Sequence, residues 1–252
     1  MSNRKRSGKL IYRPKPARIQ SGGGAISFPS SLTTPSIWID LSQQLGLTNG
    51  ANASNLTNFG TYGGLTASVP ATFISDGKNG KPILRSTSNG TAKSTYYFGT
   101  GQPNDRVYMG YPAFIAWMVI KPISIEDANR VWVDAYNTFQ LGCRYTTSNY
   151  FYIYTNPIYL PTTTPLSPDL ASGWGIYMFY ASTDKICKIY FNGLPMVTPT
   201  SFDAGRFPLI LNVSGEFAES GFIDSSVAIS SAQINELGNY LSQKWGISWS
   251  AI

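Results

Sequence analysis

Short β-prone runs separated by turn-forming residues dominate this chain from Ile26 onward. Aromatic and β-branched residues gather in these runs, and clusters of Gly, Pro, Asn and Ser divide them. Such spacing is typical of packed antiparallel sheets, because each run suffices for one strand and each cluster reverses the chain. The sequence therefore predicts an all-β fold, a sandwich or a barrel of antiparallel strands, with one short C-terminal helix.

The clearest expected strands differ in how apolar they are. Residues 113–122 (AFIAWMVIKP) are almost continuously apolar and should lie in the interior of a sheet. The turn-forming DGKNGK should connect the strands at 71–75 and 82–86. Thr183 and Asp184 should form the turn of the clearest hairpin, between 175–182 and 185–196. We expect these strands at residues 36–40, 71–75, 82–86, 113–122, 129–136, 138–145, 149–155, 175–182 and 185–196.

The segment SSAQINELGNYLSQKWG, residues 230–246, carries the signals of a single helix. Ser230 and Gln233 have the spacing of a capping box, and Gly246 stands where a helix terminator belongs. Apolar residues recur three or four positions apart, which places them on one buried stripe. The stripe consists of Ile234, Leu237, Leu241 and Trp245.

Three segments resemble the laminin-G/concanavalin A-like lectin and glucanase superfamily, in the version frequent in phage and bacterial surface proteins. They are PSIWIDLSQ (35–43), GIYMFYASTDKICKIYFNG (175–193) and GFIDSSVAISSAQINELGNYLSQKWGI (221–247). They are similar to the family's opening strand, its central hairpin, and its closing strand with helix. The resemblance implies a two-sheet antiparallel β-sandwich of the jelly-roll, concanavalin A-like type, with the sheets packed face to face. We expect the helix to plug one edge of it.

The basic residues are concentrated at the N-terminus. Seven of the 19 Lys and Arg residues precede residue 19, so the rest of the chain has 12 cations against 13 acids. Two prolines and the run SGGG prevent a helix there. We therefore divide the chain into an extended basic arm with a glycine hinge, residues 1–24, and a sandwich, residues 25–252. The arm's cations are Arg4, Lys5, Arg6, Lys9, Arg13, Lys15 and Arg18.

The arm suggests attachment to a larger assembly. Ile11, Tyr12 and the prolines are better suited to docking into protein grooves than to binding phosphates alone. No apolar run of about 7 to 15 residues follows the charged start, so we expect no signal peptide. No membrane span is expected either. Our interpretation is a non-enzymatic structural protein of a virus particle, such as a phage, made in the host cytoplasm.

In that interpretation the arm binds other virion or capsid proteins, or the packaged nucleic acid. Charged residues make up only 13% of the chain, against about 25% in an average soluble domain. Few surface charges leave little repulsion between copies, which favours a homo-oligomer or a large assembly.

Residues suited to catalysis are sparse. The chain has no histidine, which removes the commonest general base and metal ligand. It also lacks the E-x-D-x-x-E strand that places paired carboxylates in sandwich glucanases. Glu126 and Asp127 would face opposite ways on a strand, and Glu216 and Glu219 are expected in a solvated loop. We predict no catalytic residue, and a glycan-cleaving enzyme remains the second alternative.

No cofactor or metal site is predicted. Calcium stays an alternative through Asp40, Asp76 or Asp224, because many laminin-G domains bind it through such oxygens. Cys143 and Cys187 have no CxxC neighbour, and we expect two buried free thiols, with a disulfide left open.

Tyrosines in NYFYIYTNPIYL give the first alternative function, a carbohydrate- or receptor-binding module without catalysis. Tyr150, Tyr152 and Tyr154 alternate along an expected strand, and exposed aromatic rings stack on sugars. Alternating aromatics also fill the core of a sandwich, and that structural interpretation stays open.

Overall fold

A computed structural model gives the fold of the following residues. It describes 26–86, 94–98, 113–121, 129–133, 139–145, 149–155, 158–161, 173–184, 186–196, 200–201, 210–213 and 215–252. For 129–133, 139–145, 149–155, 158–161 and 200–201 this description is of the backbone. The basic arm, Glu126 and Asp127 lie outside the described residues.

Antiparallel strands account for nearly all of the regular structure. The strands are β1 (Ile37–Asp40), β2 (Asn52–Leu56), β3 (Leu65–Lys78), β4 (Lys81–Ser86), β5 (Ser94–Phe98), β6 (Ala113–Lys121), β7 (Asn129–Val133), β8 (Phe139–Tyr145), β9 (Asn149–Thr155), β10 (Ile158–Pro161), β11 (Gly175–Ala181), β12 (Ile186–Phe191), β13 (Leu194–Pro195), β14 (Thr200–Ser201), β15 (Ile210–Val213) and β16 (Gly215–Ser225). A 3-10 helix, η1 (Leu41–Gln43), follows β1, and helix α2 (Ser231–Trp245) follows β16.

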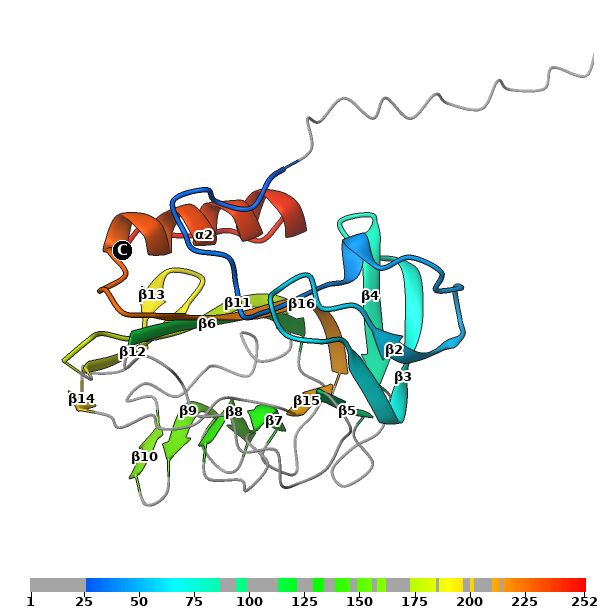
Figure 1. Ribbon diagram of the computed structural model, residues 1–252, viewed down its shortest axis with the longest axis horizontal. Coiled ribbons are helices and arrows are strands. Elements are labelled where there is room, and N and C mark those ends of the chain that lie inside the picture. Colours follow the sequence, from blue (N-terminus) through cyan, green and yellow to red (C-terminus); the bar gives the residue numbers. More distant parts are fainter. Residues whose placement is uncertain are drawn as a thin grey trace, which may run out of the picture.

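The strands form two layers that one hydrogen-bonded ladder connects. The helix-side layer contains β13, β12, β11, β6 and β16, and the opposite layer contains β10, β9, β8, β7, β15 and β5 (Figure 1). Strands β4 and β3 join them, because β4 pairs with β16 and β3 pairs with β5. This arrangement confirms the predicted all-β sandwich.

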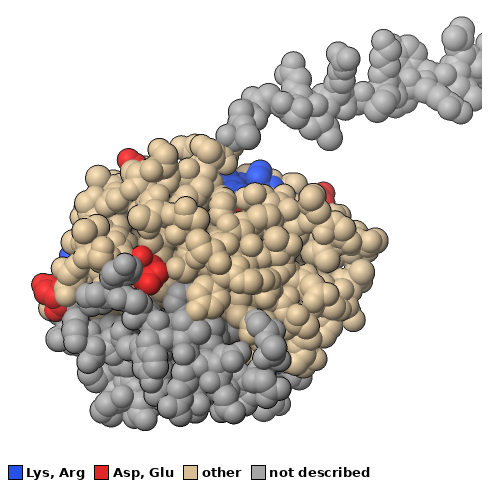
Figure 2. Space-filling model, in the orientation of Figure 1, with Lys and Arg blue, Asp and Glu red and all other residues tan. Residues whose placement is uncertain are grey.

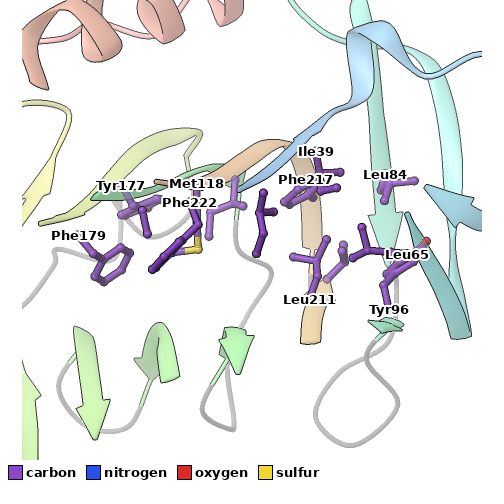
Figure 3. Packing of buried hydrophobic residues seen from close by; sticks show 14 of the residues in the cluster. Ile39, Leu65, Leu84, Tyr96, Met118, Tyr177, Phe179, Leu211, Phe217 and Phe222 are labelled. Atoms are coloured by element: carbon purple, nitrogen blue, oxygen red, sulfur yellow. The ribbon is translucent and has the colours of Figure 1, made fainter. Parts of the chain in front are cut away.

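Strand β6 lies at the centre of the helix-side layer and is buried on both faces. Phe114, Ala116, Met118 and Ile120 belong to the core between the layers, where Figure 3 shows Met118 beside Phe222. The intervening residues Ile115, Trp117 and Val119 belong to a second core beneath helix α2. Burial on both faces requires a continuous apolar run, which confirms the interior strand predicted at residues 113–122.

Helix α2 begins and ends where the sequence predicts. The Ser230 side chain accepts a hydrogen bond from the Gln233 backbone, and the Gln233 side chain accepts one from the Ser230 backbone. Gly246 ends the helix in the left-handed region, with φ of 60°. The predicted stripe of Ile234, Leu237, Leu241 and Trp245 is buried.

The expectation that this helix plugs an edge of the sandwich is wrong. Helix α2 lies across the outer face of the helix-side layer (Figure 1), and its stripe packs on side chains from β6 and β11. The physical reason is the two-sided apolar character of these strands, whose outward face must be removed from water.

Two hairpin turns contain Asn-Gly pairs with positive φ at both residues. Asn79 and Gly80 have φ of 53° and 67°, and they close the hairpin between β3 and β4. This geometry suits a two-residue hairpin and confirms the turn predicted in DGKNGK. Asn192 and Gly193 adopt the same region, with φ of 51° and 87°.

Gly221 tests how tightly the second core is packed. It lies on β16 between Trp38 and Trp117 in the ladder, and an added Cβ would overlap the Trp117 ring. We expect Gly221→Ala to lower the free energy of unfolding by about 1–3 kcal/mol in urea denaturation. Gly63→Ala is the control, because no atom lies within 4 Å of its Cβ position. Equal stability of the two variants would contradict this packing.

Candidate functional site

An open groove lies beside β2 and the first residues of β3. Its volume is about 630 Å³, and its lining comes from residues 44–66. Figure 1 shows β2 and β3 to one side of helix α2. The lining residues include Gln44, Asn52, Ser54 and Thr66, and none of the twelve is charged. The groove therefore offers amide and hydroxyl groups and no ion-pairing partner.

Four asparagines spaced three residues apart define this region. The outer two hold the backbone: Asn49 Oδ1 accepts a bond from the Ser75 N–H, and Asn58 Oδ1 accepts bonds from the Trp38 and Gly60 N–H groups. The inner two, Asn52 and Asn55, line the groove. The spacing Asn49, Asn52, Asn55, Asn58 is the sequence signal by which this site could have been found.

Gln44, near the start of the segment that lines the groove, is hydrogen-bonded to Thr57, which follows β2. Its amide Nε2 donates to the Thr57 carbonyl at 2.8 Å, and its Oε1 accepts from the Thr57 N–H at 2.8 Å. These two bonds resemble the paired backbone bonds between neighbouring strands. They hold the residue that follows η1 against the end of β2.

Unused polar groups and two leucines, one exposed and one half-buried, lie together in the groove. Asn52 and Ser54 are exposed, and their side chains form no hydrogen bond within the described part of the chain. Leu45 is 91% exposed, and Leu47 is half-buried beside it. Amide and hydroxyl groups both donate and accept, so this lining suits a ligand with hydroxyl groups and a partly apolar surface.

A cluster of three charges is buried near the groove, between β1, β16 and helix α2. Asp40 and Glu219 are cross-strand neighbours and are both 0% exposed, and Lys244 of α2 is 5% exposed. The Lys244 ammonium forms ion pairs with both carboxylates, at 2.8 Å from Glu219 Oε2. We call Asp40, Glu219 and Lys244 the charge cluster.

Glu219 accepts hydrogen bonds from several buried donors. Trp38 Nε1 lies 2.8 Å from Oε1, and Trp245 Nε1 lies 2.8 Å from Oε2. Burial raises the pKa of Glu219, the nearby Asp40 adds to the increase, and Lys244 and Trp245 oppose it. Burial also raises the pKa of Tyr240, whose hydroxyl donates to Glu219 and accepts from Lys244.

The structure corrects the predicted position of Glu216 and Glu219. Both lie in strand β16 rather than in a solvated loop, because this strand extends to Gly215 and pairs with β4 and β6. Glu216 faces partly outward and pairs with Arg85 at 2.7 Å, whereas Glu219 belongs to the charge cluster. Complete burial separates Glu219 from any substrate.

The aspartates considered for calcium do not come together. Asp40 belongs to the charge cluster, Asp76 is exposed on β3, and Asp224 accepts a hydrogen bond from Ser36 Oγ at 2.8 Å. Among the described residues, no three His, Cys, Asp or Glu side chains form a group able to hold a metal ion. Cys187 is a buried free thiol, and burial raises its pKa.

The predicted sugar-binding tyrosines lie on β9, whose bounds match the predicted strand. Tyr150, Tyr152 and Tyr154 alternate along it and share one face, opposite residues 140–144 of β8. They belong to the opposite layer, apart from the groove. Within the described parts of the chain, no helix has the length and apolar character needed to cross a membrane.

The comparisons with known proteins identify the fold. No protein-family model matches the chain, and no curated protein matches its sequence. Domain 4 of AbnA, a GH43 extracellular arabinanase from Geobacillus stearothermophilus, in complex with arabinotriose, is similar in structure. Its TM-score is 0.52 at 14% identity, and the match covers 81% of this chain and 98% of that domain.

Toxin binding domains share the same architecture. The binding domain of botulinum neurotoxin DC, solved with rat synaptotagmin II, has a TM-score of 0.56 at 11% identity over 85% of this chain. The binding domain of Paraclostridial Mosquitocidal Protein 1 has a TM-score of 0.52 at 10% identity over 83% of it. These matches cover 55% and 52% of the toxin chains, so this chain spans about half of their length. At such identities the likeness concerns the fold alone.

The charge cluster predicts a pH-dependent stability. Because the pKa of Glu219 is higher in the folded chain than its ordinary 4.5, the folded chain keeps this proton to a higher pH. The free energy of unfolding should therefore fall as pH rises above 4.5, by at most about 1.4 kcal/mol per pH unit, until the folded-state pKa is passed. Glu219→Gln removes this titration.

Urea denaturation of both proteins from pH 4 to 8 checks this prediction. The wild type should lose stability relative to Glu219→Gln as pH rises through the lower part of that range. A stability difference that stays constant, or that changes in the opposite direction, would contradict the raised pKa.

Proposed function

We propose that this chain is a non-catalytic binding module whose groove binds a neutral carbohydrate. The observation that carries the proposal is the lining of the groove, where unused amide and hydroxyl groups lie beside the exposed Leu45 and the half-buried Leu47 and no charge is present. A sugar ring has hydroxyl groups at its edge and apolar C–H groups on its faces. Asn52 and Ser54 would bind the hydroxyl groups, while Leu45 and Leu47 would contact the C–H groups.

The charge distribution supports a neutral ligand. On the face shown in Figure 2, the described surface is mostly uncharged, with only scattered acidic and basic patches. An acidic sugar would gain no ion pair from the groove, whereas hydroxyl groups gain both donors and acceptors. The solved AbnA domain with this fold holds arabinotriose, a neutral sugar, and this supports the proposal for the present chain.

The larger assembly to which this module belongs is also a proposal, and it rests on the sequence. We propose a structural protein of a virus particle, with a concanavalin A-like sandwich presented outward and the arm of residues 1–24 attached to capsid proteins or genome. The concentration of seven cations before residue 19, in a chain whose remainder is nearly neutral, supports this assignment.

Binding to neutral oligosaccharides tests the groove. The wild type should bind on a glycan array, and Asn52→Ala combined with Ser54→Ala should weaken the affinity about 5- to 150-fold, because each lost hydrogen bond contributes about 0.5–1.5 kcal/mol. Asn239→Ala is the matched control, since Asn239 is exposed on helix α2 and outside the groove. Affinity should hardly change between about 50 and 500 mM salt.

Three results would contradict this assignment. A blank array would remove the binding function, and loss of binding only on changing Tyr150, Tyr152 or Tyr154 would move the site to β9. Release of new reducing ends from mixed polysaccharides would show a glycan-cleaving enzyme.

Deleting residues 2–20 tests the proposed attachment. The truncated protein should leave the particles, while its body still unfolds cooperatively. If the arm binds phosphates, affinity for DNA should also fall with salt, with a log–log slope approaching about −0.9 per phosphate neutralised. Retention of the truncated protein on particles would refute the attachment.

A further inference from the structure

One wall of the groove is connected to helix α2 through buried contacts. Lys244 of α2 donates to Asp40 Oδ2, which also accepts from the Gln43 side chain. Asp40 Oδ1 accepts from the backbone N–H and hydroxyl of Ser42, at 3.0 and 2.7 Å, and so caps η1. Gln44, the next residue after η1, forms the paired bonds to Thr57.

We propose that Asp40 and Lys244 are positioning residues for the groove. Their ion pair fixes η1 to helix α2, and η1 in turn sets the position of Gln44, Leu45 and Leu47 along the groove. The expected effect on ligand binding rests on the proposed function. The expected position of Gln44, Leu45 and Leu47 does not depend on any ligand.

The burial of Asp40 makes this connection strong. Asp40 is 0% exposed, and both of its carboxylate oxygens are used by donors from η1 or from helix α2. A buried carboxylate that loses a charged partner has no water to replace it, so η1 cannot leave helix α2 without a large cost. Leu41, buried in the core between the layers, adds an apolar anchor to the same turn.

Glu219 provides a matched comparison within the same charge cluster. It contacts Lys244, Trp38, Trp245 and Tyr240, which lie outside η1. Asp40→Asn and Glu219→Gln each replace one buried carboxyl group by an amide and leave Lys244 with one acidic partner. In Asp40→Asn the new amide can still cap η1 through its oxygen, but its NH₂ group cannot accept from Lys244. Only Asp40→Asn therefore detaches η1 from helix α2.

Hydrogen exchange and binding of a neutral oligosaccharide test the inference on the full chain. Asp40→Asn should raise the exchange rate of the Thr57 amide about tenfold or more and should weaken binding about 3- to 10-fold. Glu219→Gln should change both by a smaller factor than Asp40→Asn does, even where thermal denaturation shows that the two variants lose the same stability. Equal changes in the two variants, or no change in either, would overturn the positioning role.

A measurement on the wild type keeps the inference testable if Asp40→Asn does not fold. Under increasing urea below the unfolding transition, the Thr57 amide and the amides in the last turn of helix α2 should open with the same free energy and the same denaturant slope. Opening of Thr57 at a much lower free energy than the end of the helix would overturn it. If the exchange results hold but the wild type binds no neutral sugar, the proposed function fails and the positioning role stands.

Discussion

The burial of β6, β11 and β16 on both faces is the constraint on which the rest of this structure depends. One face packs against the opposite layer, and the other requires helix α2 as a cover. The hydrophobic effect therefore holds the helix on the sheet. With α2 in place, Lys244 reaches the carboxylates of β1 and β16, and the turn after β1 acquires its position beside the groove.

The charge cluster adds specificity at a cost. Removing two acidic side chains and one ammonium group from water is unfavourable unless every oxygen has a donor. The Trp38, Tyr240 and Trp245 side chains supply such donors to Glu219. These directional bonds hold helix α2 in its observed register on β1 and β16, in addition to the apolar packing of its stripe. That register also sets where Gln44 meets Thr57.

Local patterns predicted the elements that depend on local physics. The bounds of β9, the capping box at Ser230 and the Asn79–Gly80 turn follow from neighbours within a few residues, and the structure agrees with all three. Features that depend on distant partners escaped prediction. Glu219 lies in a segment with glycines and acids that resembles a loop, and its ion-pair partner Lys244 lies on helix α2, outside that segment.

The position of the helix and the groove escaped prediction for the same reason. A continuous apolar strand indicates burial on both faces, but it does not say that the following helix supplies one of the covers. The asparagines at three-residue spacing were visible in the sequence, yet only the pairing of β2 with β3 shows that the inner two line a groove. The tyrosines of β9 and the cations of the arm stay predictions.

The most direct test of this account is a crystal structure of the chain soaked with a neutral oligosaccharide that it binds in solution. The account predicts a sugar ring between Gln44 and Thr66, with its hydroxyl groups bonded to Asn52 and Ser54 and its C–H face against Leu45. A sugar bound against β9, with the groove empty, would contradict it.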